Sequence, residues 1–374
     1  MRQFKTLLTL LVLLMTAATG TAWAQSVTTH VVDDDANKYT AKLKDGVQDA
    51  DLWTITPAEA STDGVYKGTE VTLTYSGRLK VKSVKATVAE KSDLLNGKFS
   101  VSATKQVQFA KGNLQATTTD LGETWTWGFA ENQWDCIGDA AANNTINGIG
   151  TVSTNGTVDL FEWVGASSTW TGAAQYGISN SISGKTDGHG NVADEALKSD
   201  WGTTMGTGWR TLTSDEWLWI FGPIDSPNPG TNCRTSSTVG GTANGRFAKA
   251  TVNGKAGVIL FPDSYTHPDG VTAPANVNIA NSAAHYDGNN YNATDWGKME
   301  AAGAVFLVAG GIRDNRYESQ VLGAGNNCIY WSSSPFTSSA DEACGIRIQN
   351  AGMNPQFDYF RSGGFAVRLV KDAQ

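Results

Sequence analysis

Residues 330–335 read YWSSSP and residues 361–370 read RSGGFAVRLV, and the segment that these two stretches enclose decides the fold of the chain. Within it, Ile346 and Ile348 are separated by one residue, which places both side chains on one face of a β-strand. We predict that this face is buried. The residues that would then point outward are Gly345, Arg347 and Gln349.

Further along, residues 356–360 read QFDYF, so three aromatic side chains stand among polar ones. Aromatic rings beside Asp, Gln and Arg give a binding surface large rigid contacts and adaptable hydrogen bonds. We therefore expect Asp358 and Tyr359 to be exposed. Phe357 and Phe360 either join this surface or fill the core beneath an ordinary loop, and the sequence leaves both alternatives open.

A capped helix is predicted in the middle of the chain, where residues 208–217 read GWRTLTSDEW. Thr213 and Glu216 have the spacing of a capping box, in which each side chain bonds to the other residue's backbone N–H. Trp217 begins the apolar face of this helix. Apolar patterns predict three further elements, a helix over 294–302 and fully buried strands over 258–261 and 304–308.

Several of these stretches resemble a known fold. The segment 208–217 is similar to one in the formylglycine-generating-enzyme branch of the C-type-lectin-like fold, although Thr211 and Leu212-Thr213 replace its usual Leu-Pro-Thr. The layout of residues 330–370 resembles the C-terminus of Bacteroidota surface proteins with the Fibrobacter succinogenes major paralogous domain. It also resembles variable proteins diversified by retroelements. Together with DLFEW at 159–163 and GAVFL at 303–307, the resemblance spans about residues 99–372.

The resemblance implies an α+β fold class with a C-type-lectin-like domain, which a small all-β (Ig-like) module, predicted below from its own alternating pattern, precedes. It also implies framework positions interleaved with positions that change freely between relatives, so diversification by a retroelement is a hypothesis for this gene. The framework positions carried over to this chain are Trp331, Ser332, Ser333, Pro355, Arg361, Gly364, Phe365, Val367 and Leu369.

The first residues have the pattern of a signal peptide, which we predict over residues 1–24. Arg2 and Lys5 precede the apolar run 7–15, and Ala22-Trp23-Ala24 fits a cleavage site. The run is too short to span a bilayer, and no later stretch predicts a transmembrane segment. We expect an exported protein, located at the cell surface, outside the cell or in the periplasm.

Residues 25–92 are predicted to form a small β-sandwich-like module. Val71 and Tyr75 belong to an alternating apolar pattern, and the turn Ser76-Gly77 predicts a hairpin with a second strand over 79–86. The regions that follow are a linker over 93–98 and the ligand-binding domain over 99–374.

The chain is acidic, with 36 acidic and 28 basic residues and a net charge of −8 at pH 7. Such a balance gives no electrostatic attraction for nucleic acid or for an anionic membrane surface. We therefore expect neither as a partner.

The cysteines Cys136, Cys233, Cys328 and Cys344 are scattered along the chain and allow three disulfide pairings. Cys328–Cys344 is the favoured pair in an oxidising compartment, with buried free thiols as an equal alternative. No two cysteines have the short spacing of a zinc site. The formylglycine-generating branch suggests a copper oxidase, but these cysteines lack its tightly spaced motif.

We expect no metal or cofactor. Where C-type lectins place calcium-binding carboxylates, this chain has Asn354-Pro355-Gln356 and Trp331-Ser332-Ser333. The acidic turn at 33–37 is either a structural calcium site or a solvated turn, with the second alternative favoured. The histidines, including His189 in the sequence DGHGN, lack the partners of a catalytic triad.

The leading hypothesis is therefore a recognition or adhesion protein that binds a protein or glycan on another cell or molecule and is not an enzyme. A fimbrial or surface-layer component that associates with itself is the second hypothesis, and an oxidase is the third. Tyr359 is the expected anchor of the binding surface. The predicted ligand-binding residues are Asp341, Glu342, Arg347, Gln349, Gln356, Asp358, Tyr359 and Ser362.

Overall fold

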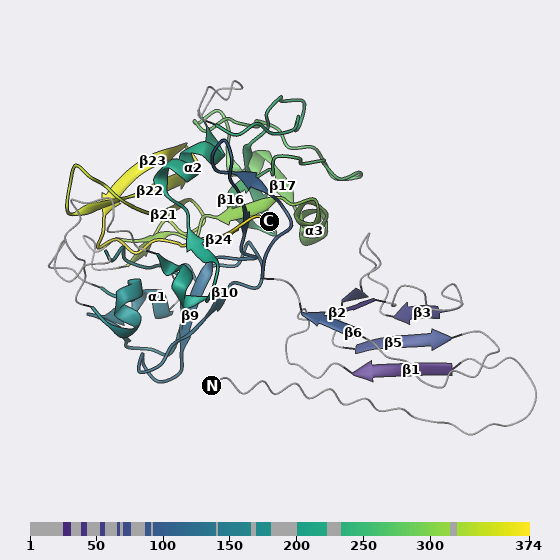
Figure 1. The fold of residues 1–374 in the computed structure, drawn as a ribbon, viewed down its shortest axis with the longest axis horizontal. Coiled ribbons are helices and arrows are strands. Elements are labelled where there is room, and N and C mark those ends of the chain that lie inside the picture. Colours follow the sequence, from purple (N-terminus) through teal and green to yellow (C-terminus); the bar gives the residue numbers. More distant parts are fainter. Residues whose placement is uncertain are drawn as a thin grey trace, which may run out of the picture. The chain divides into compact units, whose positions relative to one another are not determined.

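The structure is a computed structural model, and it divides the chain into two compact units, Met1–Ser92 and Asp93–Gln374 (Figure 1). In the first unit it describes the backbone of six strands. In the second it describes residues 93–139, 141–165, 170–180, 200–222, 233–314 and 320–374. The predicted signal peptide, the acidic turn at 33–37 and His189 lie outside the described residues.

The first unit contains two three-stranded antiparallel sheets, ordered β1-β5-β3 and β4-β2-β6. The strands are β1 (Gln25–His30), β2 (Tyr39–Lys42), β3 (Trp53–Thr56), β4 (Tyr66–Lys67), β5 (Glu70–Tyr75) and β6 (Thr87–Glu90). The second strand of the predicted hairpin, over 79–86, lies outside the described residues. A strand has two edges, and both edges of β5 are occupied, one by β1 and the other by β3.

The second unit is built from several small sheets. A four-stranded sheet β14-β24-β8-β7 joins distant parts of the chain, and a second four-stranded sheet has the order β17-β15-β16-β18. The strands of the first are β7 (Phe99–Ser100), β8 (Gln106–Phe109), β14 (Trp209–Thr211) and β24 (Leu369–Asp372). Those of the second are β15 (Phe247–Val252), β16 (Lys255–Leu260), β17 (Asn290–Tyr291) and β18 (Val305–Val308).

Two three-stranded antiparallel sheets carry the candidate sites. One contains β9 (Leu114–Thr118), β10 (Thr126–Phe129) and β13 (Gly156–Val158). The other contains β21 (Asn327–Pro335), β22 (Glu342–Gln349) and β23 (Gly352–Phe360). Two small ribbons complete the strands, β11 (Ile146–Asn147) with β12 (Thr151–Val152) and β19 (Ile312–Arg313) with β20 (Val321–Leu322).

The predicted α+β class is wrong, because the part of the chain that the structure describes is mostly β-sheet, with 36% of residues in strands and 13% in helices. The described α-helices are α1 (Ala141–Asn144), α2 (Ser214–Phe221) and α3 (Ala293–Ala301). The single-turn elements are η2 (Gly172–Tyr176), η3 (Trp201–Thr204) and η4 (Tyr286–Gly288). Of the described α-helices, only α2 and α3 exceed four residues, so the described chain is more β-rich than an α+β C-type-lectin-like domain.

The prediction of the two helices themselves is confirmed. Thr213 Oγ1 accepts a hydrogen bond from Glu216 N at 3.2 Å, and Glu216 Oε2 accepts one from Thr213 N at 2.9 Å. The capping box therefore starts α2 where the sequence places it. Helix α3 occupies the predicted range within one residue, with Asn292 as its N-cap. All four residues of β18 are buried, as their continuous apolar run predicts.

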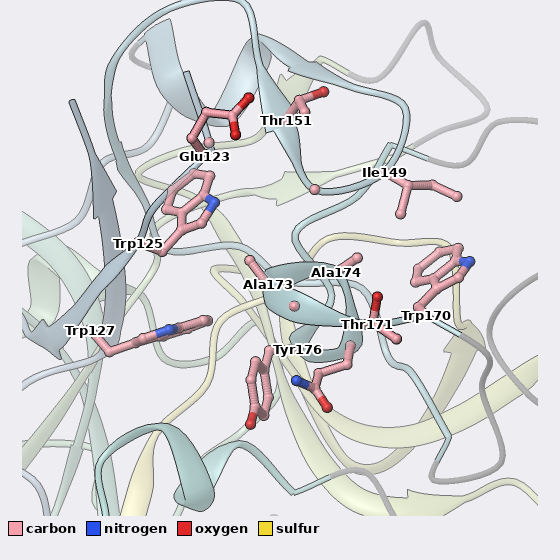
Figure 2. Close-up of a pocket in the computed structure, with 14 residues that line it drawn as sticks. Glu123, Trp125, Trp127, Ile149, Thr151, Trp170, Thr171, Ala173, Ala174 and Tyr176 are labelled. Carbon is pink, nitrogen blue, oxygen red and sulfur yellow. The ribbon is translucent and has the colours of Figure 1, made fainter. Parts of the chain in front are cut away.

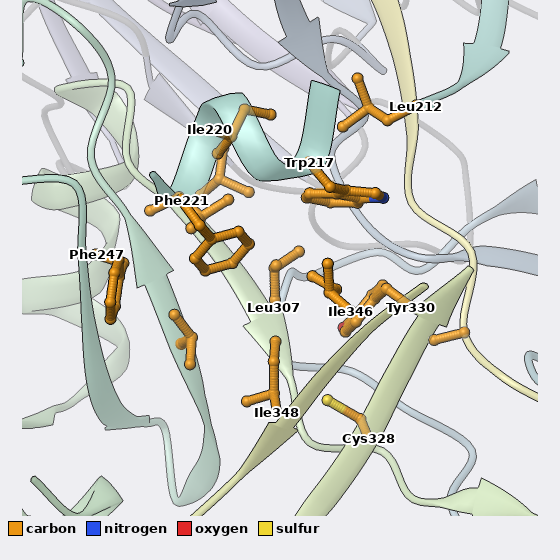
Figure 3. Packing of buried hydrophobic residues seen from close by; sticks show 14 of the residues in the cluster. Leu212, Trp217, Ile220, Phe221, Phe247, Leu307, Cys328, Tyr330, Ile346 and Ile348 are labelled. Atoms are coloured by element: carbon orange, nitrogen blue, oxygen red, sulfur yellow. The ribbon is translucent and has the colours of Figure 1, made fainter. Parts of the chain in front are cut away.

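The core lies between α2 and the strands beneath it (Figure 3). Trp217, Ile220 and Phe221 project from α2 onto Leu307 of β18 and onto Ile346 of β22, and these five side chains are fully or almost fully buried. Each such side chain contributes about 1.5–3 kcal/mol through the apolar area that it removes from water. This layer holds α2 against β21–β23, which it contacts along all three strands.

Buried cations bond the connecting segments to the core. Arg313 Nη1 donates to the Leu160 carbonyl at 3.1 Å, and its Nη2 donates to the Ser179 carbonyl at 2.9 Å. A guanidinium has five donors in a fixed geometry, so it can satisfy several loop carbonyls at once. The other buried cations that bond to main-chain carbonyls are Arg234, Arg246, Lys249 and Arg361.

The four cysteines are free thiols. Cys328 lies opposite Ile348 on the neighbouring strand, four residues along β22 from Cys344. At about 3.3 Å per residue, this offset is too long for a disulfide, which needs Cα atoms within about 7 Å. The favoured Cys328–Cys344 pair is therefore absent. Residues 93–98, for which a linker was predicted, belong to the second unit, where Leu95 N donates to Phe109 O at 2.8 Å.

Candidate functional site

The predicted binding residues lie on the antiparallel ribbon formed by β22 and β23 and at its ends. Ile346 and Ile348 are 1% and 0% exposed, whereas Arg347 and Gln349 are half-buried, which confirms the predicted inward and outward positions of these four residues. Gly345 differs, because it is buried where an outward position was predicted. The strand register shifts between Gly345 and Arg347, so the alternation of faces is interrupted there.

The ribbon does not bring the predicted residues onto one surface. Cys344 pairs with Asp358, and Ala343 pairs with Tyr359. Directly paired residues share a face, while neighbours along a strand point to opposite faces. Asp358 and Tyr359 therefore lie on opposite faces of β23. Gln356, two residues from Asp358, is exposed on the Asp358 face.

On the Tyr359 face, four residues form what we call the Arg347 cluster, namely Arg347, Phe357, Tyr359 and Asp314. The Arg347 guanidinium carbon lies 4.5 Å from the centre of the Phe357 ring. The Phe357 and Tyr359 rings stack with centroids 5.7 Å apart, and Tyr359 Oη donates to Asp314 Oδ2 at 2.5 Å. A basic group, two rings and a carboxylate thus follow one another along one side of the ribbon.

The aromatic residues of the ribbon are half-buried, which answers the question that the sequence left open. Phe357 packs partly against the core and carries Arg347, and Phe360 is also half-buried. Tyr359 was expected to be exposed, but its ring contacts Phe365 with centroids 5.3 Å apart, and Asp358 is half-buried too. Arg347, Phe357 and Tyr359 are therefore each partly accessible, whereas Asp314 is buried beneath them.

The opposite face contains a protonated thiol. Cys344 Sγ donates to the Pro335 carbonyl at 3.4 Å. Burial raises the pKa of the Cys344 thiol, and the charges of Asp358 and Asp215 raise it further, against a hydrogen bond with Ser214 that lowers it. A thiol needs a lowered pKa to act as a nucleophile at neutral pH. Glu342 is half-buried and two residues from Cys344 on this strand.

The ends of the ribbon are tied to buried Arg361. Arg361 N donates to the Asp341 carbonyl at 2.9 Å, and its Nη1 donates to the Ala340 carbonyl at 3.0 Å. Burial lowers the pKa of Arg361 to about 10, although the Asp341 charge opposes this shift. Ser362 is 9% exposed. Asp341 and Ser362 therefore lie at a structural junction beside buried Arg361. All nine framework positions named above are also buried, in different parts of residues 331–369.

In the part of the chain that the structure describes, no three His, Cys, Asp or Glu side chains gather in a way that could hold a metal ion. His267 has a structural environment, because Nδ1 lies 3.1 Å from Tyr265 Oη and Nε2 lies 3.0 Å from the Val271 carbonyl. No described helix is long and apolar enough to cross a membrane.

A second site, which we call the tryptophan pocket, was missed by the sequence analysis (Figure 2). It is an open pocket of about 730 Å³ that three segments enclose. Trp125 and Trp127 come from β10 and the turn before it, Ile149 from the β11–β12 connection, and Trp170 and Tyr176 from residues around η2. Trp125 and Trp127 alternate in the sequence, which is typical of a strand with one aromatic face, but nothing local to the sequence places Trp170 or Tyr176 opposite it.

The walls of the tryptophan pocket are anchored to the core. The Trp127 ring stacks on Phe161 with centroids 5.7 Å apart and meets Tyr176 edge-on at 5.4 Å. Trp201 Nε1 donates to the Tyr176 carbonyl at 2.7 Å, which fixes η2 from below. The pocket is therefore formed before any ligand arrives.

Comparison of the chain with protein-family models, with curated proteins and with solved structures finds no match in any of the three. Function is consequently inferred from the geometry of the two sites.

Proposed function

We propose that this chain is an exported recognition protein that binds a protein or glycan ligand through the Arg347 cluster and catalyses no reaction. The observation that carries this proposal is the contact of Arg347 with the Phe357 ring, next to the Tyr359–Asp314 hydrogen bond. Arginine and aromatic side chains dominate the binding energy of protein interfaces, because they combine large contact areas with directional bonds.

The cluster is held in place before binding, which favours recognition. Phe357 and Tyr359 lie on a strand whose partner, β22, is itself paired on both edges. The guanidinium plane stacks on a ring, an interaction worth about 0.5–1 kcal/mol at an exposed site. Arg347 therefore loses less conformational entropy on binding than an unsupported arginine would. The smaller entropy loss makes the free energy of binding more favourable.

The charge of the cluster suggests the character of the ligand. Arg347 is a cation on an acidic chain, and the carboxylate at the other end of the cluster, Asp314, is 3% exposed and already accepts the Tyr359 hydroxyl. A ligand approaching the cluster thus meets one guanidinium and two partly exposed rings. We expect it to present an acceptor group, such as a carboxylate or a sugar hydroxyl, next to an apolar surface.

Arrays of glycans and of host and bacterial surface proteins test the proposal. The chain is compared with the double variant Arg347→Ala/Phe357→Ala and with Gln356→Ala, an exposed position on the opposite face. We expect the double variant to lose at least tenfold in affinity for its array ligand while Gln356→Ala binds normally, with melting temperatures that show both variants folded.

The converse result, with full binding in the double variant, would move recognition away from this cluster. Sedimentation velocity on the same proteins addresses the structural alternative. Concentration-dependent self-association that the double variant abolishes, without binding on the arrays, would favour a surface-assembly subunit.

A further inference from the structure

The tryptophan pocket has the composition of a ligand site. Three tryptophans and a tyrosine line it, all half-buried, and Ile149 is 51% exposed at its edge. Large apolar side chains that remain in water at the edge of a pocket indicate a surface that another molecule covers. Figure 2 shows Trp125 and Trp127 along one side and Trp170 with Ile149 across from them.

The edge of the pocket is polar but nearly neutral. Glu123, Thr151, Thr171 and Gln175 all line it and are exposed. Their carboxylate, hydroxyl and amide groups provide hydrogen-bond donors and acceptors around the apolar floor. A suitable ligand therefore has apolar faces for the rings and a periphery of hydroxyl groups.

From this arrangement we infer that the tryptophan pocket binds a carbohydrate, with sugar rings stacked on tryptophan faces and sugar hydroxyls bonded to the polar edge. A pyranose ring exposes C–H groups on its faces, and these carry partial positive charge that the negative face of an aromatic ring attracts. Its hydroxyls project around the ring, where Thr151, Thr171 and Gln175 lie. The site uses no residue of the Arg347 cluster, so it does not rest on the function proposed above.

A cationic ligand fits the pocket less well. Aromatic cages bind quaternary ammonium groups most strongly when the cation is desolvated. The pocket is open, and Glu123, the one carboxylate among its described lining residues, is exposed to solvent, where its attraction for a cation is screened. Neutral hydroxyl and amide groups outnumber that carboxylate at the edge, and they match a polyhydroxylated ligand.

The space in the pocket comes from small residues. Ala173 and three glycines, Gly122, Gly150 and Gly172, line it together with the aromatic residues. All three glycines have positive φ values, of 103°, 80° and 62°, so larger side chains at these positions would be strained. The resulting volume of about 730 Å³ is within the range of small-molecule sites, roughly 300–1,000 Å³.

Calorimetric titration of the purified chain with cellobiose, maltose, lactose, chitobiose, xylobiose and mannobiose tests the inference. Sorbitol serves as a polyol without a ring, and choline as a cation. We expect at least one disaccharide to bind saturably and more tightly than sorbitol or choline. Trp127→Ala and Trp170→Ala should each weaken that binding about tenfold, which corresponds to roughly 1.4 kcal/mol.

Two further variants separate loss of the site from loss of the fold. Ala173→Tyr keeps all four aromatic residues but fills the pocket, and it should abolish disaccharide binding with little change in melting temperature. Phe357→Ala, on the Arg347 cluster, should bind the disaccharide normally. Saturable binding by none of the six disaccharides, tighter binding of choline, or equal binding by the chain and Ala173→Tyr would each overturn the inference.

Discussion

The Arg347 cluster and the tryptophan pocket lie against the same hydrophobic layer, which contains Phe161, Trp331 and Phe365, yet they are assembled differently. Three of the four residues of the cluster come from one hairpin of two adjacent strands. The pocket brings together three segments between residues 122 and 176. The sequence alone can indicate a site whose residues are close together along the chain. A site such as the tryptophan pocket, whose residues come from separate segments, becomes visible only in the folded structure.

The two sites also differ in what supports them. The Arg347 cluster lies on an antiparallel ladder of main-chain hydrogen bonds from β21 to β23, in which the register shifts between Gly345 and Arg347. The segments around the pocket rely on buried polar side chains, such as Arg313, which donates to the Ser179 carbonyl beyond η2. We therefore expect mutations of buried polar side chains to weaken ligand binding mainly at the pocket. Mutations in α2, which packs on β21–β23, should weaken binding mainly at the Arg347 cluster.

The largest effect is expected from Arg313→Met. This change leaves two buried carbonyls without their donor and removes the positive charge beside Asp159 and Glu162. Breaking such a buried charge arrangement costs about 3–5 kcal/mol. Urea unfolding should show that loss, and disaccharide binding at the pocket should fall more than array binding at the Arg347 cluster. Arg210→Met, at an ion pair whose side chains are 24% and 15% exposed, is the control and should cost less, about 1 kcal/mol.

A smaller effect is expected from Thr213→Ala, which removes the N-cap of α2, the helix that packs on β21–β23. Loss of a threonine cap costs about 1 kcal/mol of stability. Because α2 contacts β21–β23, array binding should weaken while disaccharide binding stays unchanged. Thr213→Ser retains the hydroxyl and should behave like the unaltered chain in the same unfolding curves. Equal weakening at both sites would show that the two regions do not respond separately.

Next in size is the coupling between Arg347 and Phe357. A double-mutant cycle with Arg347→Ala and Phe357→Ala, read from urea unfolding, should give a coupling free energy of about 0.5–1 kcal/mol. High salt should reduce it only slightly, because the charge lies against a ring. A coupling near zero would mean that the stacked contact contributes nothing to the pre-formed cluster.

The smallest effect concerns acid. Asp120 accepts hydrogen bonds from Thr124 N, Thr124 Oγ1 and Thr118 Oγ1 in the turn before Trp125. The hydrogen bonds from Thr124 are the main cause that lowers the pKa of Asp120 from 3.8 to about 2. A carboxylate with a lowered pKa stabilises the folded state above its unfolded pKa and ceases to do so as the pH falls through the folded value.

Disaccharide binding at the pocket should therefore weaken between about pH 4 and pH 2, as Asp120 takes up its proton. In Asp120→Asn the contribution of this carboxylate is absent at every pH, so that step in the titration should disappear. The Arg347 cluster contains none of these groups and serves as the internal comparison. An identical acid profile in Asp120→Asn would assign the effect to another residue.

Local patterns in the sequence predicted local structure correctly. The capping box at Thr213 and the alternation of Ile346 and Ile348 each depend on residues within one element, and both are present. The inward position of Gly345 was not predictable, because it follows from a register shift between two strands. A Cβ there would lie 2.8 Å from the Tyr330 carbonyl oxygen, so the position accepts only glycine.

The fold class and the pocket could not be obtained from the sequence for a related reason. The stretch from 135 to 208 has no apolar period, so its strands β11–β13 and its contacts with β10 are set by tertiary packing. Likewise, Asp358 and Tyr359 are adjacent in sequence but lie on opposite faces of β23. Composition alone grouped them, whereas the pleat of the strand separates them.

The buried guanidinium groups connect irregular segments of the chain by hydrogen bonds and not by covalent bonds. Small exported domains commonly connect such segments with disulfides, which form in an oxidising compartment and are broken by reduction. Here Arg234, Arg246, Arg313 and Arg361 make the equivalent connections to main-chain carbonyls, and all four cysteines remain thiols. These hydrogen bonds involve no sulfur atom, so a reductant leaves them intact and no oxidant is needed to form them.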